Sequence, residues 1–197
     1  MSKIRIGIVG YGNLGRGVEY SIAQNSDMEL VAIFTRRDPK TLKEANDKMV
    51  HISEIESYKD KVDVIVCNPP YKEVGTGSQN ENEVKYIARH EVKCNLEDIF
   101  KSASSLLKSK GKLYLVHKPE RIVDLLSVSR KYKLEAKNIR FVTPTNISKP
   151  SIVLIEYVKD GKNECIVGPS LIEYEEDKNG NLKYTDEILK IYGMKSK

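Results

Sequence analysis

The sequence predicts an α/β protein with a single doubly wound, mostly parallel sheet and a pair of antiparallel strands near the C-terminus. Short apolar segments alternate with segments whose apolar residues recur at helical spacing, which is the order of repeated β-α-β units. The chain has 197 residues and a hydrophobic content of 40%, which suits one domain with a buried core. No apolar run approaches the roughly 20 residues that a membrane helix needs, so no membrane partner is expected.

Four buried strands are predicted in the first third of the chain. They are Ile4–Val9, Leu30–Phe34, Val50–Ile52 and Val62–Cys67. A helix between the first two strands is predicted by apolar residues every four positions, at Leu14, Val18 and Ile22. A second helix is predicted from Pro39 to about Lys48, because proline suits a first helical turn. Ser53 followed by Glu56 resembles a capping box and predicts a helix start before the fourth strand.

The rest of the chain predicts a long loop, further strands and three helices. Residues 68–92 are polar and rich in Gly, Asn and Glu, which predicts a loop over the carboxyl edge of the sheet. Two strands are expected to pair antiparallel, at Ile139–Val142 and Ile152–Val158. The other predicted elements are a helix with apolar residues from Leu96 to Leu107, a strand at Lys112–His117 after Gly111, a helix that starts near Pro119, a turn at Asn179-Gly180 and a closing helix at Thr185–Tyr192.

A glycine-rich loop follows the first predicted strand. Its pattern is Gly10-x-Gly12-x-x-Gly15, placed between a strand and a helix. The first glycine allows a tight turn, the second lets the backbone approach a pyrophosphate, and the third lets strand and helix pack closely. The N-terminus of the helix attracts the phosphate charge. In this context the pattern predicts a Rossmann-like dinucleotide site, and a merely tight turn is the alternative.

The residues after the second strand select the nucleotide. An acidic residue there would bind free ribose hydroxyls, as in NAD or S-adenosylmethionine, but this chain has Thr35-Arg36-Arg37. Two guanidinium groups and a hydroxyl suit the 2′-phosphate of NADP, and two exposed surface arginines are the alternative. Asp38 lies past the expected position of a ribose-binding acid. The predicted cofactor-binding residues are therefore Gly10, Gly12, Asn13, Leu14, Gly15, Thr35, Arg36 and Arg37.

The amino-acid sequence of this first part resembles the N-terminal sequence of the meso-diaminopimelate dehydrogenase family. The resemblance lies in Lys3-Ile-Arg-Ile-Gly-Ile-Val-Gly-Tyr-Gly-Asn-Leu-Gly-Arg-Gly-Val-Glu and in Glu29-Leu-Val-Ala-Ile-Phe-Thr-Arg-Arg-Asp-Pro, and it ends near Val66. It implies NADP(H) binding through Gly10–Gly15 and Thr35–Arg37. Nothing here matches the family's later substrate-binding and dimerisation region, so deamination of diaminopimelate is not expected.

A second motif, Asn68-Pro69-Pro70-Tyr71, ends the fourth strand. Open α/β sheets bind ligands at this edge. The Asn68 side chain and the Pro69 carbonyl can accept two N–H bonds from an exocyclic amine, and Tyr71 can stack on a base. These four residues are the candidate catalytic residues for methylation of a base amine. A proline-rich turn is the alternative.

The second part resembles the bacterial tRNA adenine-N6 methyltransferases that modify a valine tRNA. The resemblance runs from about Val62 to Gly193, through Asn68-Pro-Pro-Tyr-Lys, Leu113-Tyr-Leu-Val-His-Lys-Pro-Glu-Arg and Tyr184-Thr-Asp-Glu-Ile-Leu-Lys-Ile-Tyr-Gly. It implies a catalytic role for Asn68–Tyr71, and Thr143-Pro144 departs from the expected His-Pro. The family's own S-adenosylmethionine loop and ribose acid do not appear in residues 1–66.

The charge is unevenly distributed along the chain. The net charge is +5, yet residues 1–66 hold ten basic and ten acidic residues, so the excess lies in residues 67–197. A basic second half suits tRNA, and a solvated lysine-rich surface is the alternative. By charge and position, the candidate RNA contacts are Arg89, His90, Lys118 and Arg121.

Three scattered cysteines and three histidines without ligand spacing predict neither disulfides nor a metal site. A start that leads straight into a strand, without a signal peptide, together with free cysteines, suits the cytoplasm.

Together these features predict one Rossmann-like domain, residues 1–197, made of a dinucleotide-binding half (1–66) and a methyltransferase-like half (67–197). The leading hypothesis is a chimera that binds NADP(H) with little or no native turnover. The first alternative is an S-adenosylmethionine-dependent tRNA adenine-N6 methyltransferase that acts through Asn68–Tyr71. The second alternative is an NADPH-dependent oxidoreductase. The sequence leaves the oligomeric state open.

Overall fold

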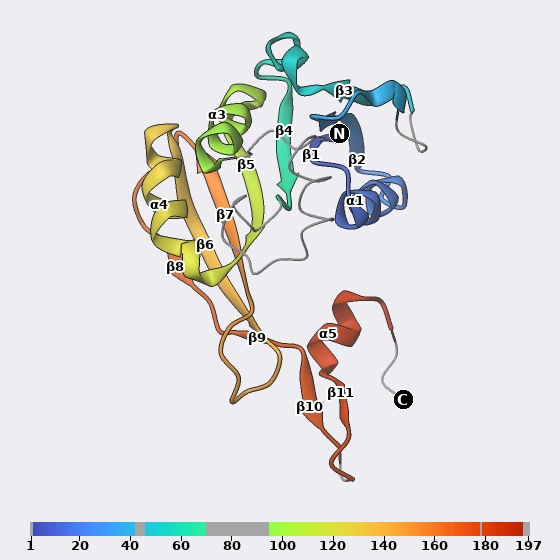
Figure 1. Ribbon diagram of the computed structural model, residues 1–197, viewed down its shortest axis with the longest axis vertical. Coiled ribbons are helices and arrows are strands. Elements are labelled where there is room, and N and C mark those ends of the chain that lie inside the picture. The colour runs from blue at the N-terminus through green and yellow to red at the C-terminus, as the bar shows by residue number, and fades with distance from the viewer. Residues whose placement is uncertain (1, 42–45, 70–94, 178, 195–197) are drawn as a thin grey trace, which may run out of the picture.

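A continuous mixed sheet forms the centre of the protein (Figure 1). The computed structural model describes residues 2–41, 46–69, 95–177 and 179–194. The sheet has nine strands in the order β3-β2-β1-β4-β5-β7-β6-β8, and β9 also pairs with β6. A separate two-stranded sheet is formed by β10 and β11.

The strands have the following bounds: β1 Ile4–Val9, β2 Met28–Thr35, β3 Met49–His51, β4 Val62–Cys67, β5 Leu107–His117, β6 Leu134–Thr143, β7 Ile152–Lys159, β8 Ile166–Val167, β9 Leu171–Ile172, β10 Tyr174–Glu176 and β11 Leu182–Tyr184. The α-helices are α1 Asn13–Ala23, α3 Leu96–Leu106, α4 Ile122–Lys131 and α5 Asp186–Ile191. Three 3-10 helices are η1 Pro39–Thr41, η2 Ile52–Tyr58 and η3 Pro119–Arg121. None of the described helices is both long and apolar enough to cross a membrane.

The pairing confirms the predicted fold class. Strands β3, β2, β1, β4 and β5 run parallel to one another, as β-α-β units require. Strand β7 pairs antiparallel with both β5 and β6, so the predicted antiparallel pair is present inside the same sheet. The short closing helix is also confirmed, as α5. The Thr185 side chain caps it by accepting a hydrogen bond from the Ile188 amide.

Helices cover the two faces of the sheet (Figure 1). On one face, α1 buries Ile22 against Ile6, Ile8 and Ile33. On the other face, α3 and α4 cover a larger cluster that includes Phe100. Alternation along the strands explains this division, because successive side chains of a strand point to opposite faces.

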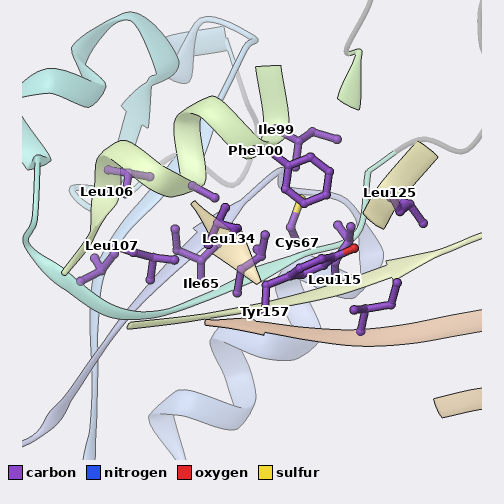
Figure 2. Close-up of a cluster of buried hydrophobic side chains, with 14 of the residues drawn as sticks. Ile65, Cys67, Ile99, Phe100, Leu106, Leu107, Leu115, Leu125, Leu134 and Tyr157 are labelled. Carbon is purple, nitrogen blue, oxygen red and sulfur yellow. The ribbon is translucent and has the colours of Figure 1, made fainter. Parts of the chain in front are cut away.

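The larger cluster spans the predicted boundary between the two halves. Phe34 from β2 belongs to the same cluster as Phe100 from α3 and Tyr157 from β7. Figure 2 shows the Phe100 ring above Tyr157, and the two rings meet edge to face with centroids 5.2 Å apart. The hydrophobic core is therefore shared by residues from both sides of Cys67.

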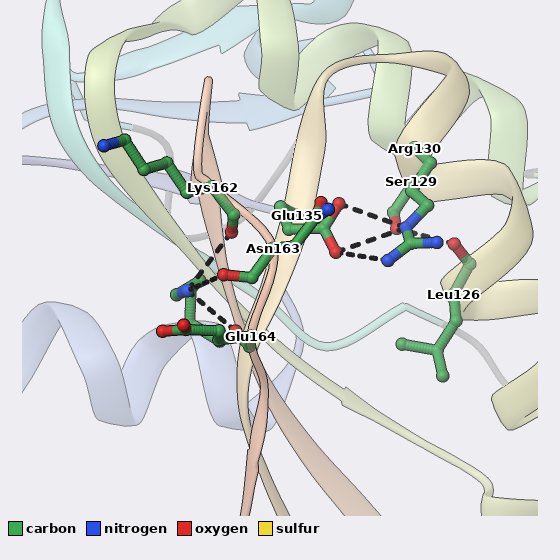
Figure 3. A network of polar contacts seen from close by, with 8 residues as sticks. Leu126, Ser129, Arg130, Glu135, Lys162, Asn163 and Glu164 are labelled. Carbon is green, nitrogen blue, oxygen red and sulfur yellow. Dashed lines mark hydrogen bonds and ion pairs between the residues drawn. The ribbon is translucent and has the colours of Figure 1, made fainter.

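Polar contacts hold the far end of the sheet together (Figure 3). The Lys137 ammonium on β6 donates to the backbone carbonyls of Lys162, Asn163 and Glu164 at 3.2, 3.2 and 2.7 Å, which ties the chain after β7 to β6. The Arg130 guanidinium forms a forked pair with Glu135, with its shortest distance 2.6 Å, and so joins α4 to β6.

Two predicted local features are wrong. The helix expected from Pro39 to about Lys48 is only the turn η1 at its start, and residues 46–48 lead directly into β3. Residues 42–45 lie outside the described part. The expected capping box is also absent, because His51 rather than Ser53 caps η2, with its ring accepting from the Ser53 amide at 3.3 Å. Because Met49–His51 pairs with Ile33–Thr35, strand β3 runs up to His51, the residue that caps η2.

The fifth strand begins earlier than predicted. It starts at Leu107, directly after α3, and Gly111 lies within it instead of ending the helix. A change of register opposite Val62 and Val64 accommodates this start, and Lys110 adopts a left-handed conformation with φ of 66°. A side chain at Gly111 would approach the Lys108 carbonyl oxygen to 2.9 Å, which explains the glycine at this bulge.

Candidate functional site

The carboxyl ends of β2, β1 and β4 bring the two sequence motifs to one edge of the sheet. Val9 at the end of β1 is paired with Phe34 on one side and with Cys67 on the other. Gly10, Thr35 and Asn68 follow these three residues. The glycine loop, the arginine pair and the start of the Asn-Pro-Pro-Tyr motif therefore lie next to one another.

The glycine loop makes a tight turn at Gly10 and a close approach to α1 at Gly15. Gly10 has φ of +92°, in the region that favours glycine, and its amide donates to the Phe34 carbonyl at 2.9 Å. A Cβ at Gly15 would lie 2.6 Å from the Gly10 carbonyl oxygen, so only glycine permits this approach of helix to loop. A Cβ at Gly12 would meet no atom within 4 Å, which leaves room beside the backbone.

The N-terminus of α1 opens onto this loop. Gly12 caps the helix in an extended conformation, and it has no side chain to accept a bond from the first-turn amides. The first turn has no acidic residue, so its partial positive charge is not neutralised from within the turn. A cavity of about 150 Å³ lies here, and its lining includes Gly10, Gly12, Asn13, Leu14, Gly15 and Asn68.

The turn after β2 is held by several hydrogen bonds. Thr35 is buried and its hydroxyl accepts from the Arg37 amide at 3.2 Å. The Arg37 guanidinium donates to the Tyr11 carbonyl at 3.3 Å, which links this turn to the glycine loop. His51 contacts the Arg36 carbonyl through Nε2 at 3.1 Å. Asp38 lines a separate pocket of about 460 Å³.

A larger groove lies between η2 and α3. It has a volume of about 490 Å³ and shares Val9, Gly10 and Asn68 with the cavity at the glycine loop. Its apolar lining comes from the sheet edge and both helices. Its polar lining consists of Arg36, Ser53, Glu56, Asn68, Asp98, Lys101, Ser102 and Ser105. The two cavities therefore share lining residues at Gly10 and Asn68, where the glycine loop lies next to the Asn-Pro motif.

Sequence reasoning missed the part of this groove that α3 supplies. Residues 98, 101, 102 and 105 are polar and follow the spacing of one helical face. That polar face was a signal in the sequence, but polar residues on a helix usually face water. Only the packing of α3 beside η2 turns the face into the wall of a groove.

The candidate catalytic motif is described only in its first half. Asn68 and Pro69 line the groove, while Pro70 and Tyr71 lie outside the described residues. Arg89 and His90, two of the four candidate RNA contacts, also lie outside them.

The other two candidate RNA contacts follow β5, the strand next to β4. The Lys118 ammonium donates to the Ser151 carbonyl at 3.2 Å, and the Arg121 guanidinium pairs with Asp124 at 2.7 Å. Neither residue is among the described residues that line the two cavities. The structure places both residues at the same end of the sheet as Asn68. Their charged groups contact the Ser151 carbonyl and the Asp124 carboxylate.

His117 ends β5 and is buried at this same sheet edge. Its Nδ1 accepts a hydrogen bond from the Lys118 amide at 2.8 Å, so the proton of the neutral ring is on Nε2. Burial lowers the pKa of His117, and the charge of Arg121 lowers it further. The ring is therefore neutral at pH 7. Within the described residues, no group of three or more His, Cys, Asp or Glu side chains has the arrangement of a metal site.

These features define the protein as an α/β protein with a Rossmann-like, methyltransferase-type fold. Residues 6–141 match the family model described as the methyltransferase small domain. This match covers more than half of the chain, and the chain belongs to that family.

Curated relatives fall into two groups, as the sequence motifs predict. A meso-diaminopimelate D-dehydrogenase of Ureibacillus thermosphaericus is 43% identical over 125 residues, which is 59% of this chain and 36% of the relative. The corresponding protein of Lysinibacillus sphaericus is 58% identical over 67 residues, 34% of this chain and 21% of the relative. A tRNA1(Val) (adenine(37)-N6)-methyltransferase of Porphyromonas gingivalis is 29% identical over 97 residues, 49% of this chain and 37% of the relative.

The lengths of these matches can be compared with the extent of the dehydrogenase resemblance that the sequence predicts. The matches cover 36% and 21% of the lengths of these two dehydrogenases. The 67-residue match agrees with a resemblance that ends near Val66, whereas the 125-residue match is longer than that first part. The similarity to both dehydrogenases and a tRNA methyltransferase is confirmed.

Solved structures support the fold. A predicted O-methyltransferase from Agrobacterium tumefaciens superposes with a TM-score of 0.70 at 16% identity, covering 96% of this chain and 88% of the other. A putative class I S-adenosylmethionine-dependent methyltransferase from Listeria monocytogenes has a TM-score of 0.57 at 12% identity, with 86% and 59% covered. At these identities the likeness establishes the fold alone.

Proposed function

We propose that this chain binds NADP(H) through the glycine loop and the groove beside it, as one Rossmann-like domain of chimeric origin. The observation that carries the proposal is the position of Arg36, which lines the same groove as Gly10 and Asn68. It comes from the end of β2, where an acid would bind the ribose of NAD or S-adenosylmethionine. A guanidinium suits a 2′-phosphate, which NADP has and S-adenosylmethionine lacks.

The residues present fit a dinucleotide. Gly10 and Gly15 shape a close turn, a side chain at Gly12 would meet open space, and α1 presents its N-terminus to the cavity. Gly12 and the first-turn amides of α1 would hold the pyrophosphate, and Arg36 and Arg37 the 2′-phosphate. The bound cofactor would supply hydride chemistry at its nicotinamide. The proposal assigns binding and no turnover to this chain, because we assign no described side chain to a hydride acceptor.

The test of this proposal is a calorimetric titration with NADPH and NADH. We expect NADPH to bind at submillimolar concentration. The Arg36→Ala variant should weaken NADPH about ten- to a hundred-fold, since a charged hydrogen bond contributes roughly 1.5–3 kcal/mol, and should weaken NADH less. The charge-matched control is Arg130→Ala, on α4, away from the groove. Failure of the unaltered protein to bind NADPH contradicts the proposal, and equal losses for both cofactors contradict the role of Arg36.

A second candidate function is methylation of adenine N6 in tRNA. The family membership and the position of Asn68 and Pro69 in the groove favour it. In this function the Asn68 side-chain carbonyl and the Pro69 backbone carbonyl would accept the two N–H bonds of the target amine. S-adenosylmethionine, when bound, would supply the methyl group. The missing ribose acid after β2 weighs against tight binding of that cofactor.

Transfer of a labelled methyl group to unmodified tRNA tests the second function. Activity in the unaltered protein and its loss in Asn68→Ala would support it. Lack of transfer to tRNA and to adenine-containing oligonucleotides, in protein that is folded by circular dichroism, would reject it. Reduction of a small molecule by NADPH stays the last alternative, supported only by similarity to part of the dehydrogenases.

A further inference from the structure

The groove beside the glycine loop has walls from both predicted halves of the chain. One wall is η2 with the end of β2, which contribute Ser53, Glu56 and Arg36. The other wall is α3, which contributes Lys101 and Ser102 among others. Arg36 and Lys101 are the two cations among the described lining residues, and they come from different walls.

Lys101 differs from other lysines around α3 in its contacts. Lys131 pairs with Glu97 at 3.2 Å, and Lys108 pairs with Asp63 at 2.8 Å. Lys101 is exposed, and it has no ion pair or hydrogen bond with another residue in the described part of the chain. Its ammonium is therefore available to a ligand in the groove that it lines.

We propose that Lys101 binds the 2′-phosphate of the nucleotide together with Arg36, so that α3 completes a phosphate site that begins on β2. This inference rests on the proposed NADP(H) function and names a specificity-determining residue for it. A phosphate carries up to two negative charges, so it can accept bonds from two cations on opposite walls. The Ser53 and Ser102 hydroxyls line the same groove and can donate to the remaining phosphate oxygens.

Two carboxylates in the groove limit where the phosphate can lie. Glu56 is directed toward Ser105, whose hydroxyl donates to it at 3.4 Å. Asp98 is exposed in the first turn of α3, where water and salt screen its charge. Repulsion by these groups disfavours a phosphate near Ser105 and favours one near Arg36. The two carboxylates therefore restrict where the phosphate can lie, but they do not prevent it from binding beside Arg36.

The experiment compares adenosine 2′,5′-bisphosphate with adenosine 5′-monophosphate by calorimetry. These probes differ by the 2′-phosphate alone. Lys101→Ala should weaken the bisphosphate about five-fold, as expected for one exposed charge contact, and leave the monophosphate within about two-fold. Lys101→Arg should retain most of the affinity. Lys131→Ala is the charge-matched control and should change neither probe.

The outcomes separate this inference from the function on which it rests. If the unaltered protein prefers the bisphosphate, Arg36→Ala removes the preference and Lys101→Ala does not change it, the Lys101 site is wrong and NADP(H) binding stands. Equal weakening of both probes by Lys101→Ala also overturns the site. If the unaltered protein binds neither probe and does not bind NADPH, both proposals fail.

Discussion

At the scale of single residues, the close approach of Gly15 to the Gly10 carbonyl determines the shape of the glycine loop. Gly15→Ala places a Cβ 2.6 Å from a backbone oxygen, and backbone atoms on both sides cannot move aside as a flexible side chain would. We expect the free energy of unfolding to fall by about 1–2 kcal/mol in urea titrations.

Gly17→Ala is the matched control on the same helix, because a Cβ there meets no atom within 4 Å. It should raise the free energy of unfolding by about 0.5–1 kcal/mol, through the better helix propensity of alanine. Equal effects of the two substitutions would show that the close approach is not present.

Tyr157 is a second residue with a specific energetic role. Its hydroxyl is buried and has no hydrogen-bond partner within the described residues. Tyr157→Phe removes this polar atom and keeps the ring against Phe100. We expect urea unfolding to show a gain of about 1 kcal/mol at pH 7.

The same tyrosine should affect stability at alkaline pH. Burial raises the pKa of Tyr157 above its usual value near 10. The neutral phenol is therefore favoured in the folded state, and its contribution is fully present below about pH 10 and is lost as the pH rises further. Tyr157→Phe should reduce that alkaline loss, and a variant less stable than the unaltered protein at pH 7 would reveal a partner for the hydroxyl.

At the scale of elements, Asp63 on β4 connects three neighbouring strands across the predicted boundary. Its carboxylate accepts from the Arg5 amide of β1 at 2.9 Å and from the Lys108 ammonium of β5 at 2.8 Å. Although partial burial alone would raise the pKa of Asp63, the bonds from Lys108 and Arg5 outweigh it and lower the pKa. The folded state therefore favours the charged form.

Asp63→Asn tests this connection. A lowered pKa gives stability that is present above the unfolded value near 4 and is lost as the pH falls through the folded value. We expect a loss of about 1 kcal/mol at neutral pH, discounted for the partly exposed pair, and a smaller difference between the proteins as the pH falls from about 5 to below about 3. Glu97→Gln, in an exposed pair, is the control. A difference that stays constant with pH would contradict the role of the charge.

The sequence predicted the elements best where local pattern and packing agree. Val62–Cys67 was predicted with its observed bounds, because a buried parallel strand is a short apolar run between polar segments. The helix expected up to Lys48 does not form at its end, because the Asn46 carbonyl closes a turn with the Met49 amide and the Lys48 carbonyl accepts from the Ile33 amide of β2. Likewise, the start of β5 at Leu107 depends on a register change that no local pattern shows.

The candidate site was predictable only in part. Gly10 and Asn68 carry recognisable motifs at strand ends, so their meeting at one sheet edge followed from a parallel topology. Ser53, Glu56 and Lys101 belong to no ligand-binding motif in the sequence. Their place in the groove arises from the packing of η2 beside α3, which is a tertiary contact between segments far apart in the chain.

At the scale of the whole molecule, the shared core predicts that the two halves unfold together. Phe34 of the first half and Tyr157 of the second belong to one buried cluster, and the sheet crosses the boundary without interruption. We expect a single transition with coincident midpoints in far-ultraviolet circular dichroism and in the fluorescence of the 11 tyrosines. Two separate transitions would contradict the proposal of one domain.

The most direct test of the central claim is a paired calorimetric titration of the protein with NADPH and with S-adenosylmethionine. Arg36 in the groove, and the lack of an acid directly after β2, predict that NADPH binds more tightly. Binding of S-adenosylmethionine without binding of NADPH would contradict this account and would make tRNA methylation the leading function.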